Sequence, residues 1–246
     1  MADRGSFWDR FERKTLLAFT GYQGRVETVV SEIARVGIND LNVQWQFPNP
    51  FESVIVSNIS HKKGLDSPGY MNCTMGHYSA VKTAFHLGMK TCLIMEDDIA
   101  FLKDVDEIRT IVNSLPEDFD VAMLDWFATS PGFPPESVKK CIEDRSANEH
   151  WAEFEAVRSC GCYALSRRAM EKFIWLNEAA VTSPSVGKMR ICDQFFEKAF
   201  MGCDMKMYLS KKNVAVQRHT TVHNSNFDLI ADAYKAMGID VSEYGG

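Results

Sequence analysis

The stretch TCLIMEDDIAF, Thr91–Phe101, decides the fold class of this chain. Its apolar run, Leu93–Met95, stands directly before three adjacent carboxylates, Glu96, Asp97 and Asp98. A short apolar run that ends in a charged cluster predicts a central strand that stops at the edge of a sheet. Carboxylates this close repel one another, so a stable fold must place a positive group among them. A solvated acidic turn is the simpler interpretation of such a triplet taken alone, and the rest of the chain has to decide between the two.

The composition is that of an ordinary globular protein. The chain has 246 residues, of which 46% are hydrophobic and 24% charged, and its formal net charge is −6. This mildly acidic balance gives no reason to expect a nucleic-acid partner. No apolar run approaches the roughly 20 residues that a membrane span needs, and the charged start MADRGSFWDRFERK lacks a signal-peptide core. We therefore expect a cytoplasmic protein without a transmembrane segment.

The seven cysteines form no recognisable disulfide or metal pattern. Their number is odd, their spacing is irregular, and no C-x-x-C pair is present. A chain of this length can bury a core without cross-links, so reduced thiols are expected. A zinc site is disfavoured, because Cys160 and Cys162 lack a second matching pair.

Strand and helix patterns alternate along the chain. Strand patterns are TLLAFT (15–20), LNVQWQF (41–47), SVIVSN (53–58), TCLIM (91–95), DVAMLDW (120–126) and CYAL (162–165). Helical patterns cover 25–37, 73–88, 104–115, 167–176 with Ser166 as its N-cap, and 192–200. This alternation predicts an α/β fold in a single domain, 1–246, with a mostly parallel central sheet flanked by helices.

Three further features carry structural predictions. Residues 127–156 are rich in Pro, Ser and charge and show no clear period, which predicts a long loop or a small insertion with a little helix. The segments KMYLS (206–210) and NVAVQ (213–217) are expected to form a closing hairpin. His77 falls on the apolar stripe of the helix 73–88. A histidine in such a place is more often a satisfied core residue than a ligand.

The position of the acidic cluster favours a metal site. In an open α/β sheet, ligands bind beyond the carboxyl ends of the strands, and Glu96–Asp98 follow such an end. Hard carboxylate oxygens suit Mg²⁺ or Mn²⁺, particularly when the metal also holds substrate phosphates. The chain has neither the G-x-x-x-x-G-K-[ST] motif of P-loop enzymes nor G-x-G-x-x-G. These observations indicate a metal–diphosphate site without a phosphate-binding glycine loop.

Several segments also carry a resemblance to a known family. They are NCTMGHYSAVKTAFHLGMKTCLIMEDDIAFLKD (72–104), SCGCYALSRRAMEKFI (159–174), CDQFF (192–196) and VQRHTTVHNS (216–225). Together they resemble glycosyltransferase family 25, the lipopolysaccharide-type galactosyltransferases, in which a GC-x-x-SH helix start leads to a strand ending in LEDD. This sequence departs from that pattern with Asn72 and Gly76, while His77 is retained. The family's opening strand and arginine correspond to AFTGYQGR, which ends at Arg25.

The resemblance implies a GT-A-like fold and an inverting transfer of a sugar, with galactose favoured, from a UDP-sugar to a glycan hydroxyl. The acceptor would be a glycan or a lipid-linked oligosaccharide in lipopolysaccharide or other cell-surface polysaccharide biosynthesis. Peripheral contact with a membrane is compatible with such an acceptor. The implied cofactor is a divalent cation, Mn²⁺ or Mg²⁺, which neutralises the charge that grows on the leaving diphosphate.

The resemblance also suggests roles on the donor side of the site. Asp98 is expected to bind the metal directly, with help from Glu96. Asp97 would bind the metal or the ribose of the donor, and Arg25 would also contact the donor. His223 is preferred over His219 as the histidine that completes the metal shell, although two exposed tail histidines are the simpler interpretation.

Inversion requires a base on the acceptor side. Asp193, which opens a late helix, is the first candidate, and an ordinary N-terminal helix acid is the competing interpretation. Asp125, at another strand end, is the second candidate base or an acceptor contact. Trp126 and Trp151 could stack on sugar faces, although such aromatic residues more often belong to a core.

Two other classes of function remain open. One is a metal-dependent nucleotidyltransferase, which would consume a nucleoside triphosphate instead of a UDP-sugar. The other is a non-catalytic domain that binds nucleotide sugars or glycans. Glu96, Asp97 and Asp98 are all present, which disfavours a decayed site.

Overall fold

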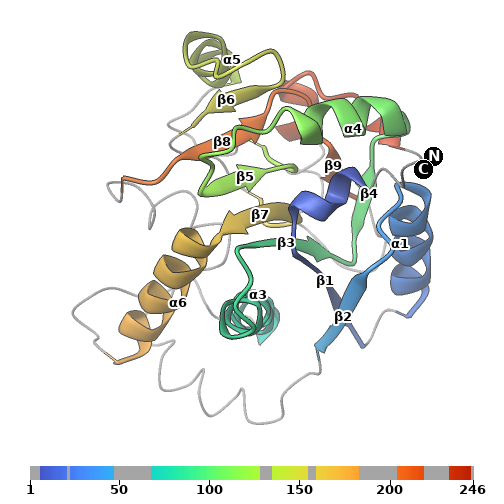
Figure 1. Ribbon diagram of the computed structural model, residues 1–246. Helices are drawn as coiled ribbons and strands as arrows, with labels where there is room; N and C mark the ends of the chain where they lie inside the picture. Colours follow the sequence, from blue (N-terminus) through green and yellow to red (C-terminus); the bar gives the residue numbers. More distant parts are fainter. Residues whose placement is uncertain are drawn as a thin grey trace, which may run out of the picture.

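The computed structural model describes residues 6–20, 23–46, 68–127, 135–154, 159–182, 204–218 and 233–244. In these residues a central sheet lies between two layers of helices (Figure 1). Two predicted elements lie outside the described residues, the strand at 53–58 and the helix at 192–200. The alternation of strands and helices is that of an α/β protein, as predicted.

The central sheet has seven strands in the order β2-β1-β3-β7-β5-β8-β6. Their bounds are Arg13–Phe19 (β1), Leu41–Gln46 (β2), Thr91–Glu96 (β3), Val121–Met123 (β5), Trp151–Glu153 (β6), Cys162–Ser166 (β7) and Met207–Ser210 (β8). β1 runs parallel to β2 and β3, β5 runs parallel to β8, and only β7 and β6 run against their neighbours. The sheet is therefore mostly parallel, and the prediction is confirmed.

Helices cover both faces of this sheet. Their bounds are Gln23–Arg35 (α1), Pro68–His86 (α3), Val105–Asn113 (α4), Pro135–Asp144 (α5) and Arg167–Thr182 (α6), with short 3₁₀ helices at Phe7–Arg10 and Val241–Tyr244. The apolar sides of α1 and α4 pack in one cluster and those of α3 and α6 in the other, on opposite faces in Figure 1. The predicted cap of α6 is present, because Ser166 Oγ accepts a hydrogen bond from the Ala169 amide at 3.2 Å. None of the described helices is long and apolar enough to cross a membrane.

The predicted closing hairpin is wrong. β8 belongs to the central sheet, whereas β9 (Ala215–Gln217) pairs with β4 (Ile99–Phe101) in a separate two-stranded sheet. The segment between β8 and β9 is hydrogen-bonded to the residues that follow β5. The Val214 amide donates to the Leu124 carbonyl at 2.9 Å. The Asn213 side chain donates to the Trp126 carbonyl at 3.0 Å. These bonds to the segment after β5 direct β9 away from β8.

The segment 127–156 is more than an insertion. It contains the little helix that was expected, α5, but it also supplies β6, an edge strand of the central sheet. Trp151 in β6 is fully buried, and its Nε1 donates to the Ile111 carbonyl at 2.8 Å. A three-residue strand anchored by one buried aromatic ring has too short a pattern to stand out in the sequence.

Candidate active site

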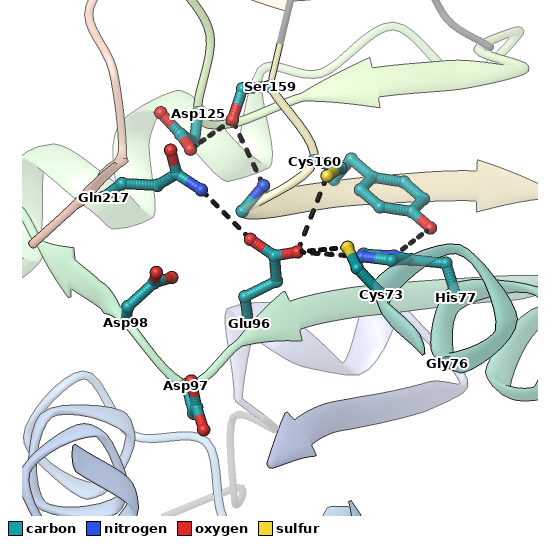
Figure 2. Close-up of polar contacts among 12 residues, drawn as sticks. Cys73, Gly76, His77, Glu96, Asp97, Asp98, Asp125, Ser159, Cys160 and Gln217 are labelled. Atoms are coloured by element: carbon teal, nitrogen blue, oxygen red, sulfur yellow. Dashed lines mark hydrogen bonds and ion pairs between the residues drawn. The ribbon is translucent and has the colours of Figure 1, made fainter. Parts of the chain in front are cut away.

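Several chain segments meet at the carboxyl end of β3. Glu96 is the last residue of β3, and Asp97 and Asp98 form the turn into β4. The pairing of Ile99 with Gln217 brings the end of β9 to the same place. Asp125 follows β5 at this edge of the sheet, and Figure 2 shows it on the far side of Gln217 from Asp97. The fold therefore gathers carboxylates from two strand ends, as the sequence predicted for a site of this kind.

Arg25, near the start of α1, is a positive group among the carboxylates. Its Nη2 lies 2.8 Å from Asp97 Oδ1 and 2.9 Å from Asp98 Oδ2. Asp97 Oδ2 also accepts the Phe19 amide at 2.8 Å, which fixes the end of β1 to the turn. The Asp97 side chain is fully buried, so its role in this structure is to hold the turn and the arginine in place.

Asp98 differs from Asp97 in two respects. Its side chain is 22% exposed, so part of it reaches solvent. Its Oδ1, like Asp97 Oδ1, is buried without a hydrogen-bond partner in the part of the chain that the structure describes, but Asp97 Oδ1 lies in an ion pair with Arg25, which meets Asp98 through Oδ2 instead. Burial, together with the negative charge of Glu96, raises the pKa of Asp98 to about 8, despite the opposing effect of Arg25. An unpaired carboxylate oxygen surrounded by negative charge is a place that favours a cation.

Glu96 points to the opposite side of the chain from Asp97 and toward His77 and the two cysteines (Figure 2). Its Oε1 lies 3.0 Å from His77 Nε2, 3.3 Å from Cys73 Sγ and 3.5 Å from Cys160 Sγ. Its Oε2 accepts Gln217 Nε2 at 3.0 Å. Burial opposes ionisation of Glu96, but the hydrogen bond and positive charge of His77 outweigh it and lower the pKa of Glu96.

His77 is a buried residue of α3 with a partner on each ring nitrogen. Nε2 meets Glu96, and Nδ1 lies 2.9 Å from the Tyr163 hydroxyl. The side chain is fully buried, as the apolar stripe of the helix predicted. His77 is therefore the second positive partner that the acidic cluster required.

Asp125 lies in a closely packed pocket of hydrogen-bond donors. Ser159 Oγ donates to its Oδ2 at 2.5 Å and the Tyr234 hydroxyl to its Oδ1 at 2.6 Å. Burial raises the pKa of Asp125 to about 7, although both of these hydrogen bonds lower it. A side chain at Gly161 would place a Cβ 2.5 Å from Asp125 Oδ2, so glycine is required there.

The structure thus brings Arg25, Glu96, Asp97, Asp98 and Asp125 to one edge of the sheet. Asp193, His219 and His223 lie outside the described residues.

The suggested sugar-stacking role of the two tryptophans is wrong. Trp126 is 2% exposed and donates to the Ser210 carbonyl, and Trp151 is fully buried.

Sequence reasoning missed three residues that shape the site: Ser159, Gln217 and Tyr234. Gln217 and Ser159 lie in segments that carry the family resemblance, so that signal was available for them. Nothing in the sequence around Tyr234 marks it as a partner of Asp125.

No known protein-family model and no curated protein sequence matches this chain. Solved structures with similar shape include a glycosyltransferase involved in glycosylation of the major capsid of PBCV-1, with 9% identity, a TM-score of 0.49, and 91% of this chain and 99% of that chain covered. The galactosyltransferase LgtC, in complex with donor and acceptor sugar analogs, has 9% identity, a TM-score of 0.40, and 92% and 95% coverage. The inositol-1-phosphate CTP transferase from T. maritima has 11% identity, a TM-score of 0.43, and 94% and 98% coverage. Similarity at this level does not assign an activity, so the function has to be argued from the site.

Proposed function

We propose that this chain is a metal-dependent glycosyltransferase with a single GT-A-like domain, 1–246, that transfers a sugar from a UDP-sugar to a glycan hydroxyl. The observation that carries the proposal is Asp98, whose buried Oδ1 lacks a hydrogen-bond partner among the described residues. This oxygen lies at a strand end of an α/β sheet, where ligands of such folds bind. The family resemblance of the surrounding segments supports the choice of reaction and favours galactose as the sugar.

The residues present fit a hard divalent cation, Mn²⁺ or Mg²⁺. Asp98 offers an unpaired carboxylate oxygen, and carboxylate oxygens are the ligands that these ions prefer. When bound, the cation would neutralise the charge that develops on the leaving diphosphate. Arg25 and Asp97 act on Asp98 as positioning residues, because their ion pairs fix the turn on which it stands. His223 is the proposed further ligand.

Two carboxylates are proposed for the acceptor side. Asp193 is the first candidate base, on the strength of the resemblance. Asp125 is the second, and its pKa near neutrality suits a group that accepts a proton at physiological pH. Both oxygens of Asp125 already accept hydrogen bonds, however, which favours a role in shaping the site around Gly161.

The biological setting proposed is cell-surface polysaccharide biosynthesis at the cytoplasmic side of a membrane, with a glycan or lipid-linked oligosaccharide as acceptor. This setting rests on the resemblance to family 25.

A metal-dependent nucleotidyltransferase is the competing proposal, because the same carboxylate would serve a cation bound to a nucleoside triphosphate. A non-catalytic nucleotide-sugar or glycan-binding domain is the third. Turnover separates these classes: the first releases UDP from a UDP-sugar, the second releases pyrophosphate from a triphosphate, and the third does neither.

Thermal unfolding with UDP and Mn²⁺ tests the donor site. A ligand that binds only the native state raises the melting temperature by mass action, so Mn²⁺ and UDP together should stabilise the wild type. Asp98→Asn should lose this shift and remain folded. Asp144→Asn, at an exposed aspartate that ends α5, is the matched control and should keep it. Full stabilisation by UDP in the presence of EDTA would contradict a cation-dependent donor site.

A further inference from the structure

A second group of possible metal ligands lies next to the Asp97–Asp98 turn and includes Glu96, the residue that precedes it. It consists of Cys73 and His77 from α3, Glu96 at the end of β3, and Cys160 just before β7. One ligand atom from each residue lies within 4.8 Å of all the others, and three of the four side chains are buried. Figure 2 shows the other three converging on one carboxylate oxygen of Glu96. We propose that these four side chains bind a structural zinc ion, a site separate from the proposed donor cation.

The ligand types are those of zinc. Thiolates are soft donors and imidazole is a borderline one, and zinc accepts both together with a carboxylate oxygen. Four protein ligands without an open position are typical of structural zinc sites. Asp98, by contrast, offers only hard oxygen. The two sites therefore differ in the metal that they select.

The spacing of the ligand atoms fits tetrahedral zinc. With Zn–S bonds of about 2.3 Å and Zn–N and Zn–O bonds of about 2.0 Å, neighbouring ligand atoms would stand roughly 3.3–3.8 Å apart. The observed separations from Glu96 Oε1 are 3.0 Å to His77 Nε2, 3.3 Å to Cys73 Sγ and 3.5 Å to Cys160 Sγ. The separations among Cys73, His77 and Cys160 are within 4.8 Å, so shifts of up to about 1 Å would complete the geometry.

The groups behind the ligands are also in place. A histidine that binds zinc almost always contacts a polar partner through its other ring nitrogen, and a carboxylate ligand is itself hydrogen-bonded. His77 Nδ1 lies 2.9 Å from the Tyr163 hydroxyl. Gln217 Nε2 donates to Glu96 Oε2, the oxygen that does not face the thiols. These contacts fix the orientations of the His77 ring and the Glu96 carboxylate before any ion binds.

A cluster held by hydrogen bonds alone is the competing explanation. It would direct two thiols, which are weak donors, and one imidazole onto a single buried oxygen. Zinc binding would release the thiol protons of Cys73 and Cys160 and the Nε2 proton of His77 to solvent, so that both sulfurs bind as thiolates and the imidazole binds in its neutral form. The ion would then tie α3, β3 and the segment before β7 together beside the Asp97–Asp98 turn.

Zinc was disfavoured in the sequence because Cys160 and Cys162 lack a second matching pair, but only Cys160 of the two belongs to this set. The four ligands come from three separate segments, 73–77, 96 and 160, so no local cysteine motif in the sequence indicates this site. Only the pairing of β3 with β7 brings Cys160 to Glu96.

Metal analysis of the purified protein tests the proposal. The wild type, expressed with zinc in the medium and passed over a chelating resin, should retain about one zinc per chain, as a closed four-ligand site does. Cys73→Ala with Cys160→Ala should lose it. Cys92→Ala, at a buried thiol of β3 outside the cluster, is the matched control and should retain the zinc. Asp98→Asn should retain it as well, which separates this site from the donor site.

Cobalt substitution of the wild type supports or overturns the proposal even if the double variant does not fold. Co²⁺ bound by two thiolates in a tetrahedral site should show sulfur-to-cobalt charge-transfer absorption and intense visible bands. Loss of zinc on the chelating resin together with a cobalt spectrum that lacks thiolate absorption would contradict the site.

Discussion

Asp125 is the residue whose protonation should be visible in the stability of the whole protein. Its pKa in the folded protein, about 7, lies above the ordinary value of 3.8, because the side chain is buried. The folded protein therefore holds a proton that the unfolded chain releases between about pH 4 and pH 7, so stability falls as the pH rises through that window. The slope from this one group is at most about 1.4 kcal/mol per pH unit.

Asp125→Asn removes this titration while preserving the shape of the side chain. Urea unfolding at pH 5 and pH 8 should show a smaller loss of stability in the variant than in the wild type. Besides burial, the negative charge of Asp125 is one of the causes that raise the pKa of Asp98, so the difference between the two proteins also includes a change in the titration of Asp98. Equal pH dependence in the two proteins would show that Asp125 is ionised in the folded state across this range.

His77→Ala should lower the free energy of unfolding by about 1–3 kcal/mol, the usual cost of leaving buried polar partners unsatisfied. The variant would remove the positive partner of the Glu96 carboxylate and one hydrogen-bond partner of the Tyr163 hydroxyl. His86→Ala, at the exposed end of the same helix, is the control and should change stability little. Unchanged stability together with loss of donor binding would instead make His77 a direct donor ligand.

Asp193→Asn tests the proposed base. A general base typically contributes about 10²–10⁴-fold to the rate and touches the donor little. We expect turnover to fall by about that factor, while UDP and Mn²⁺ affinity stay near the wild-type values in a titration. If turnover survives, Asp125 becomes the next candidate for the base.

At the scale of the elements, the segment before β7 fits closely against Asp125. Gly161→Ala would place its Cβ 2.5 Å from Asp125 Oδ2 and 3.2 Å from Gln217, contacts that force one of the two side chains to move. We expect the variant to lose stability and UDP binding together, measured by thermal unfolding. Gly88→Ala, at a positive-φ glycine with open space around it, should lose stability but keep UDP binding. Normal UDP binding by Gly161→Ala would contradict a role for this segment in the site.

The sequence predicted the elements of the fold better than their pairing. Segments such as β1, β3 and α1 can be predicted from the sequence, because burial on one or both faces produces a recognisable pattern of apolar residues. The pairing partners of β8 and β9 depend instead on single hydrogen bonds, such as that from Asn213 to the Trp126 carbonyl. Contacts of this kind join residues far apart in the chain and leave no local pattern.

The same limit applies to the candidate site. The acidic triplet could be recognised because its three charges adjoin a buried strand in one short stretch. The different partners of its members could not be predicted from the sequence. Glu96 contacts His77 of α3, whereas Asp98 pairs with Arg25. Alternation along the chain separates Asp97 from Glu96 and Asp98. The difference between Glu96 and Asp98 follows from the partners that distant segments supply, His77 to Glu96 and Arg25 to Asp98.

At the scale of the whole molecule, the central proposal is a cation-dependent donor site at one edge of an α/β sheet, with Asp98 as its metal ligand. Turnover of UDP-galactose in the presence of a glycan acceptor, followed as UDP release with Mn²⁺ and with EDTA, tests this claim most directly. The account predicts release by the wild type only when the divalent cation is present, and loss of release in Asp98→Asn but not in Asp144→Asn. Equal release in EDTA, undiminished release by Asp98→Asn, or no release from any UDP-sugar by a wild type that binds UDP would contradict it.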